Sequence, residues 1–209
     1  MNRKKHWDTV YAAKASDQLS WYQETPVTSL DLIDQTGVAR EDAIIDVGGG
    51  ASVLVDHLLA LGYTDLTVLD ISGRALRAAR RRLSGKADQV CWIESDITML
   101  EPQRQYALWH DRAVFHFLTA PADRAKYVAL LKNSLATDGF LVIGAFAVDG
   151  PARCSGLDVV RYDRQGICAE LGACFRLLGE FADPHKTPWG AEQKFAFFSF
   201  RYLGNDDRH

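Results

Sequence analysis

The chain has 209 residues, of which 47% are hydrophobic and 24% are charged, a balance that can build the core of one globular domain. The formal net charge of −3 gives no general electrostatic attraction to nucleic acid. Four widely spaced cysteines without a CxxC pair argue against a zinc site and a disulfide framework, and the six histidines show no metal-ligand spacing, so we expect no bound metal.

The N-terminus is basic but is not followed by the apolar stretch of a signal peptide. No apolar run has the length that spans a bilayer. The arginines between residues 74 and 82 are interpreted as a solvated helix face rather than as a nucleic-acid patch. We therefore expect a soluble, cytoplasmic protein without a nucleic-acid or membrane partner.

Strand and helix signals alternate from about residue 27 to residue 146. Apolar residues at helical spacing, with glycine or a turn beyond them, predict helices over residues 27–37, 52–61, 72–83 and 124–135. Short apolar runs predict buried strands over residues 43–47, 66–70, 90–93, 106–109 and 140–146. This alternation is typical of a doubly wound α/β sheet.

The tail has a different pattern. We expect a helix over residues 162–171 and then two strands, 175–178 and 194–200, joined by about fifteen residues. Strands joined without a crossover helix are expected to be antiparallel. Nothing marks a second domain, so residues 1–209 are predicted to form one domain, with an N-terminal arm (1–26) and a core (27–209).

A glycine-rich loop follows the first predicted strand, as Asp46-Val47-Gly48-Gly49-Gly50, and Asp70 ends the second strand. Ligands of open α/β sheets lie at this edge, and a carboxylate there accepts hydrogen bonds from ribose hydroxyls. A nicotinamide dehydrogenase would carry a third glycine at position 53, where this chain has Val53. A sulfonium nucleoside has no phosphates and does not need that glycine, so the loop favours S-adenosylmethionine.

A second acid, Asp96, follows the third predicted strand and precedes Ile97. Its carboxylate is expected to accept from the exocyclic amine of an adenine, while Ile97 and Ile71 cover the two faces of the ring. The alternative is that Asp96 caps the next turn, as aspartate often does.

The order of Asp46–Gly50, Leu69–Ser72 and Ser95–Ile97 resembles motif I, the acid that follows it and the adenine motif of class I S-adenosylmethionine-dependent methyltransferases. The resemblance covers the chain from about residue 6 to residue 202. It implies a mostly parallel seven-stranded sheet with an antiparallel final strand, S-adenosylmethionine as methyl donor and S-adenosylhomocysteine as product. Gly48, Gly50 and the acids Asp46, Asp70 and Asp96 would bind the donor.

A narrower resemblance concerns His6–Tyr11 and Ser20–Tyr22. These segments are similar to those of the branch that contains citrate synthase lysine and elongation factor 1A lysine methyltransferases. The resemblance implies that Tyr11, with Trp21 or Tyr22, closes over the methionine end of the donor, so that the arm covers the donor site. The alternative is that the aromatics only hold the arm against the core.

The acceptor is expected to meet the segment 109–117, which follows the fourth predicted strand. This segment lacks the N/D-P-P-Y/F loop, and its absence argues against a DNA or glutamine methyltransferase. His110 and Asp111 are predicted to orient or deprotonate an acceptor. The alternatives are that His110 packs beside the adenosyl group and that Asp111 caps the next helix with Arg112 as its partner.

The long segment 185–193 is the second acceptor candidate, because loops of this length tend to be functional. Glu192 would attract a cationic lysine and Trp189 would flank its stem. The loop 150–156 would form the opposite wall, although both loops also fit ordinary surface connections.

These residues predict methyl transfer to a nitrogen or oxygen acceptor, with a protein lysine ahead of a small molecule carrying a carboxylate, thiol or hydroxyl. A closed pocket beneath the 150s and 180s loops would favour the small molecule, and a flat acidic groove would favour a protein. A third reading is a catalytically silent S-adenosylmethionine-binding protein.

Overall fold

The computed structural model describes residues 2–102 and 104–204, so residues 1, 103 and 205–209 of the expected domain lie outside the described part. The helices are α1 (Arg3–Ala13), α2 (Val27–Thr36), α3 (Leu54–Ala60), α4 (Gly73–Leu83), α5 (Pro121–Ser134) and α6 (Arg164–Leu171), with short 3-10 helices at η1 (Ser16–Gln18), η2 (Ser84–Gln89), η3 (Ile97–Met99) and η4 (Phe115–Phe117). The strands are β1 (Ile44–Val47), β2 (Leu66–Asp70), β3 (Val90–Glu94), β4 (Tyr106–Arg112), β5 (Leu135–Phe146), β6 (Arg153–Cys154), β7 (Leu157–Asp158), β8 (Phe175–Lys186) and β9 (Glu192–Tyr202).

Seven of these strands form one sheet in the order β3-β2-β1-β4-β5-β9-β8. The pairs from β3 to β5 are parallel, and β9 is antiparallel to both β5 and β8. This confirms the predicted doubly wound, mostly parallel sheet with an antiparallel last strand. The carboxyl ends of β1 to β5 therefore meet along one edge, where the ligand site was expected.

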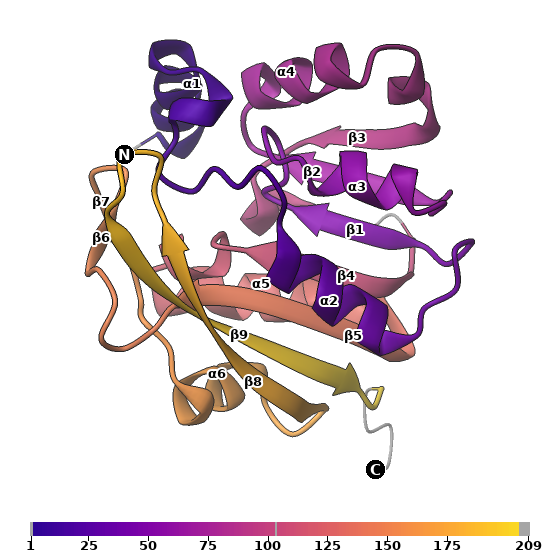
Figure 1. The fold of residues 1–209 in the computed structure, drawn as a ribbon. Coiled ribbons are helices and arrows are strands. Elements are labelled where there is room, and N and C mark those ends of the chain that lie inside the picture. Colours follow the sequence, from indigo (N-terminus) through magenta and orange to yellow (C-terminus); the bar gives the residue numbers. More distant parts are fainter. Residues whose placement is uncertain (1, 103, 205–209) are drawn as a thin grey trace.

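Helices cover both faces of the sheet (Figure 1). On one face, α5 and α6 pack against alternate residues of the strands, and Ile45 belongs to this cluster. On the other face, α2, α3 and α4 pack against the intervening residues, among them Ile44. Because helices cover both faces, all four residues of β1 are buried, and three of them are apolar. Within the described residues no helix combines the length and the apolar character needed to cross a membrane.

The N-terminal arm begins with a helix, α1, which the sequence did not predict. None of its residues is buried, so it lacks the apolar stripe that marks a core helix. The side chain of Asn2 caps it by accepting from the backbone N–H of Lys5 at 2.9 Å. In Figure 1, α1 lies beside α4, on the side toward which the parallel strands run.

The predicted loop between residues 178 and 194 is wrong. Strand β8 continues to Lys186 and β9 begins at Glu192, so a tight hairpin replaces the long connection. Side chains of β8 alternate between inward and outward positions as far as His185. Pro184 is tolerated because β8 lies at the edge of the sheet, where a missing N–H costs no ladder bond.

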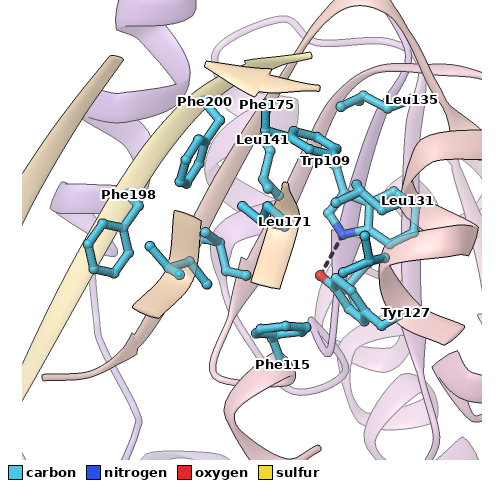
Figure 2. Close-up of a cluster of buried hydrophobic side chains, with 14 of the residues drawn as sticks. Trp109, Phe115, Tyr127, Leu131, Leu135, Leu141, Leu171, Phe175, Phe198 and Phe200 are labelled. Carbon is cyan, nitrogen blue, oxygen red and sulfur yellow. Dashed lines mark hydrogen bonds between the residues drawn. The ribbon is translucent and has the colours of Figure 1, made fainter. Parts of the chain in front are cut away.

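A chain of hydrogen-bonded side chains joins β4 to α5 inside the core. Trp109 Nε1 donates to the hydroxyl of Tyr127 at 2.9 Å, and that hydroxyl donates to Asp111 Oδ2 at 2.7 Å. Figure 2 shows the first of these bonds among the surrounding aromatic and leucine side chains. All three side chains are buried, so each bond satisfies a polar group that has no access to solvent.

We predict that Tyr127→Phe lowers the free energy of unfolding by about 1–3 kcal/mol, because it leaves a buried indole N–H and a buried carboxylate without this partner. Urea unfolding measures the change. Tyr162→Phe is the matched control, since the Tyr162 hydroxyl is buried and has no partner among the described residues. Equal effects of the two substitutions would contradict a role for the hydrogen-bonded chain.

Candidate functional site

The glycine loop after β1 is held in a shape that larger residues would not allow. Gly48 has a φ of +75°, and a Cβ atom there would lie 2.1 Å from Cγ2 of Val114. A Cβ on Gly50 would lie 2.4 Å from Asp70 Oδ2. The loop therefore brings its backbone directly against the ends of β2 and β4.

Asp70 is the central acid of this edge. Its two carboxylate oxygens accept from the backbone N–H groups of Gly50 at 3.1 Å and Ser72 at 2.7 Å. Burial raises the pKa of Asp70 to about 7, and the neighbouring carboxylates of Asp46 and Asp8 act in the same direction. The two N–H groups oppose that rise but do not cancel it.

A cavity opens at this edge, and we call it the main cavity. Its wall includes seven of the predicted donor-binding residues, namely Tyr11, Trp21, Gly48, Asp70, Ile71, Asp96 and Ile97. They come from α1, the segment after η1 and the ends of β1, β2 and β3. Gly50 does not line this cavity, although its N–H orients Asp70.

Asp96 caps the following turn and also lines the main cavity. Its Oδ1 accepts from the N–H of Thr98 at 2.9 Å and so caps η3. Its Oδ2 lies 3.5 Å from Arg3 Nη1, at the wall of the main cavity. Capping therefore fixes the carboxylate in place without removing it from the cavity.

Aromatic side chains form the cover of the main cavity. The ring of Trp7 lies 5.8 Å from that of Trp21 and 5.0 Å from that of Phe117, both in edge-to-face geometry. Polar contacts hold α1 above them: Lys4 Nζ lies 2.6 Å from Glu94, and the Ser72 hydroxyl donates to Asp8 at 2.6 Å. The arm thus encloses the cavity through both apolar and charged contacts.

A second, smaller cavity adjoins the first through Gly48, Trp21 and Arg112, which line both. Asp46 and His110 line the second cavity. His110 Nδ1 lies 2.7 Å from Asp46 Oδ1, and its Nε2 lies 2.9 Å from the Ser29 hydroxyl.

The pairing of His110 has a chemical consequence. Both ring nitrogens are engaged by buried partners, so the imidazole presents no free lone pair to an acceptor. The other oxygen of Asp46, Oδ2, is buried and has no partner among the described residues. The arrangement orients Asp46 rather than activating His110.

Asp111 lies in neither cavity. Its side chain is fully buried on the α5 face, and its oxygens accept from Tyr127 and from the N–H groups of Val114 at 2.8 Å and Phe115 at 3.1 Å. Burial raises the pKa of Asp111 to about 6. Asp111 therefore holds the turn that leads into η4, which is close to the capping alternative, although the N-cap itself is Val114 and Arg112 is not the partner of Asp111.

The hairpin residues expected to bind the acceptor lie apart from the main cavity. Trp189 is 59% exposed at the tip between β8 and β9, with Lys14 Nζ 5.5 Å from its ring centroid. Glu192 is exposed at the start of β9. Neither side chain lines the main cavity, although β9 starts beside the carboxyl end of β5. Trp189 instead lines a neighbouring cavity together with Trp21 and Cys154, two residues that also line the main cavity.

Trp7 and Phe195 line the main cavity and were not predicted to do so. Arg112, Phe117 and Cys154 also line it; they were not singled out, but they lie in the segments 109–117 and 150–156 that were expected to meet the acceptor. Trp7 lies in the segment His6–Tyr11, the same segment whose family resemblance pointed to Tyr11, so the sequence carried a signal for it. Arg112 had been assigned to the loop after β4, whereas β4 extends through it. Phe195 reaches the cavity because β9 pairs antiparallel with β5, which sets Phe195 opposite Phe146 at the carboxyl end of β5. Cys154 belongs to the separate β6–β7 hairpin that follows β5 in the chain.

Residues 44–139 match a family model described as a methyltransferase domain. No curated protein matches the sequence. The solved structures that share the fold include three with low sequence identity to this chain. The first, from work on the conversion of a disulfide bond into a thioacetal group during echinomycin biosynthesis, has a TM-score of 0.79 and 15% identity over 98% of this chain and 93% of its own.

The second is the N-methyltransferase NodS from Bradyrhizobium japonicum WM9 with S-adenosyl-l-homocysteine, with a TM-score of 0.71 and 16% identity over 96% of this chain and 99% of its own. The third is 1,6-didemethyltoxoflavin-N1-methyltransferase from Burkholderia thailandensis with bound 1,6-didemethyltoxoflavin and S-adenosylhomocysteine, with a TM-score of 0.70 and 18% identity over 95% of this chain and 83% of its own. The chain therefore has the class I methyltransferase fold, and residues 44–139 are similar to the methyltransferase family model.

Proposed function

We propose that the chain is an S-adenosylmethionine-dependent methyltransferase that acts on a nitrogen or oxygen atom of a small molecule. The observation that carries the proposal is the placement of Asp70 and Asp96 in one cavity with the glycine loop at Gly48. Acids after successive strands beside a glycine turn fit a nucleoside. Val53 in place of a third glycine favours a nucleoside without phosphates.

The donor would lie along the carboxyl ends of β1, β2 and β3. Asp70 would accept from the ribose hydroxyls, and Asp96 from the adenine amine, between Ile71 and Ile97. The free oxygen of Asp46 would accept from the ammonium group of the methionine end, because it is buried and unpartnered in the adjoining second cavity. Tyr11 and Trp21 would close over the sulfonium.

The acceptor would occupy the part of the main cavity beyond Val114, between Phe117, Cys154 and Phe195. This space is apolar and is covered by α1 through Trp7, which is the closed arrangement expected for a small molecule. Two of the similar structures support the same class, since both are N-methyltransferases and one of them holds 1,6-didemethyltoxoflavin. A protein lysine, the acceptor first favoured by the sequence, would have to pass beneath α1.

The reaction breaks the bond between the methyl carbon and the sulfonium sulfur and forms a bond from that carbon to the acceptor atom. The electron pair goes to the sulfur, and a neutral acceptor loses a proton to the solvent. The chain acts mainly by positioning the two reactants. The aromatic cover excludes water, and the cavity aligns the acceptor with the methyl group. His110 acts as a positioning residue for Asp46.

The acceptor class is tested by incubating the protein with methyl-labelled S-adenosylmethionine and a cell extract separated into small molecules and proteins. We expect label to enter the small-molecule fraction with wild-type protein and not with Asp70→Asn. Label found only in the protein fraction would contradict the small-molecule proposal and would favour a protein lysine as the acceptor.

A further inference from the structure

Among the described residues, Arg112 is the one charged side chain that lines both the main cavity and the second cavity. It ends β4 and points to the same face of the sheet as Gly144 and Phe195 of the neighbouring strands, and its guanidinium carbon lies 4.6 Å from the Phe195 ring centroid. Burial lowers the pKa of Arg112 to about 10, so the group still carries its charge at neutral pH. Neither the binding of the donor nor the alignment of the acceptor, as proposed, requires this charge.

The hydrogen bonds of Arg112 leave one edge of the guanidinium unused. Nη1 donates to the backbone oxygen of Trp21 at 2.9 Å. Nε and Nη2 are shielded from solvent and have no partner among residues 2–102 and 104–204. Buried donors of a charged group are costly to leave unpaired, so this edge points to a ligand.

The charge of Arg112 is also not neutralised by a contact. Asp183 and Asp46 act on it through space, but neither forms an ion pair with it in the described part of the chain. These carboxylates lower the cost of burying the guanidinium, while they leave its Nε and Nη2 donors free.

The unused edge has the geometry of a carboxylate receptor. Nε–H and Nη2–H lie side by side on a planar group and can donate two parallel hydrogen bonds to one carboxylate. The edge belongs to a side chain that reaches over β5 toward β9, away from the ribose and adenine residues at the ends of β2 and β3. The acceptor end of the main cavity, with Phe195 and Cys154, is the space on this side.

We propose that Arg112 binds a carboxylate of the methyl acceptor through Nε and Nη2, which makes the acceptor a small molecule with an acidic group and an apolar body. The inference rests on the proposed function and deepens it. The bound carboxylate is the recognition group, and the methyl is transferred to another atom of the acceptor, because hydrogen bonding to Arg112 reduces the nucleophilicity of the carboxylate oxygens.

The test uses the full chain saturated with S-adenosylhomocysteine and three probe pairs: benzoate and benzamide, phenylacetate and phenylacetamide, and 4-aminobenzoate and 4-aminobenzamide. Each pair shares its body and differs in charge. Dissociation constants measured by NMR are expected to favour at least one acid over its amide by tenfold or more. Arg112→Met should abolish this preference, and Arg112→Lys, which keeps the charge but loses the fork, should reduce it.

The control is Arg164→Met, which removes an exposed arginine of α6 and should leave the preference unchanged. Melting temperatures show whether each variant is folded. Equal binding of acid and amide, or no binding of any probe to the wild-type complex, would overturn the inference. A loss of affinity for S-adenosylhomocysteine in Arg112→Met, without a loss for decarboxylated S-adenosylmethionine, would also overturn it by assigning Arg112 to the carboxylate of the donor.

Failure of the proposed function is distinguishable from failure of this inference. If wild-type protein does not bind S-adenosylhomocysteine, the donor site itself is wrong. If wild-type protein binds it and only the acid preference is missing, the donor site stands and the role of Arg112 is withdrawn.

Discussion

Asp70→Asn is expected to weaken the binding of S-adenosylhomocysteine about 100-fold. Asp70 would accept hydrogen bonds from both ribose hydroxyls, and bonds to a charged group contribute roughly 1.5–3 kcal/mol each, where about 1.4 kcal/mol is tenfold in affinity. Asparagine keeps the size of the side chain but replaces one acceptor by a donor. Isothermal titration calorimetry measures the loss.

The same substitution should not destabilise the fold at pH 8. Burial raises the pKa of Asp70 to about 7, so the folded protein binds a proton that the unfolded chain releases near the ordinary pKa of aspartate. The free energy of unfolding therefore falls as the pH rises from that value through about 7, and asparagine removes this penalty. A variant that loses both donor binding and stability at pH 8 would contradict the account.

Donor affinity should also depend on pH in a direction fixed by Asp70. The ribose hydroxyls donate to the ionised carboxylate, so binding requires loss of the proton and affinity increases from pH 6 to pH 8. The increase is at most about tenfold per pH unit below the pKa. In Asp70→Asn this contribution should be absent, and an unchanged pH profile would show that another group is responsible.

Gly50→Ala is expected to weaken donor binding on the order of 30-fold, since overpacking typically costs about 1–3 kcal/mol. The added Cβ would lie 2.4 Å from Asp70 Oδ2 and 2.6 Å from Cβ of Ala75. Either the loop or Asp70 has to move, and both belong to the donor site. Calorimetric titration with S-adenosylhomocysteine gives the change in affinity.

Gly85→Ala serves as the matched control, because an added Cβ there meets no atom within 4 Å. It should leave donor affinity within twofold of wild type, a range of about 0.4 kcal/mol. If Gly50→Ala binds the donor as well as Gly85→Ala does, then the close approach of the loop to Asp70 has no part in binding.

The sheet and the donor side of the site follow from local sequence patterns. Strands β1 and β2 are short apolar runs with an acid at the last or next-to-last position, so Asp46 and Asp70 were singled out together with the strands that carry them. The topology of a parallel sheet brings the carboxyl ends of its strands to one edge, so their proximity could be predicted from the strand assignments alone.

The acceptor side depends on contacts that no local pattern reveals. Residues 110–112 are polar and were assigned to a loop, yet they complete a buried strand. His110 is satisfied by Ser29, 81 positions away in the sequence, and Asp111 by Tyr127. Polar residues inside a strand are stable only with such partners, and partners from distant elements are invisible to a pattern of hydrophobic residues.

The helix α1 was missed for a related reason. It buries no residue and is held by side chains such as Lys4 and Asp8, whose partners lie on β3 and at the start of α4. The hairpin of β8 and β9 was missed because Pro184 indicated a loop, although an edge strand accepts proline. As a result, Trp189 was expected within a long loop, whereas it lies at the tip of the β8–β9 hairpin.

Calorimetric titration of the wild-type protein with S-adenosylhomocysteine, in parallel with NAD, tests the central claim most directly. The account predicts binding of one S-adenosylhomocysteine per chain at micromolar concentration and no binding of NAD. Absence of S-adenosylhomocysteine binding, or a preference for NAD, would mean that the glycine loop and Asp70 hold a different ligand and that the methyltransferase proposal is wrong.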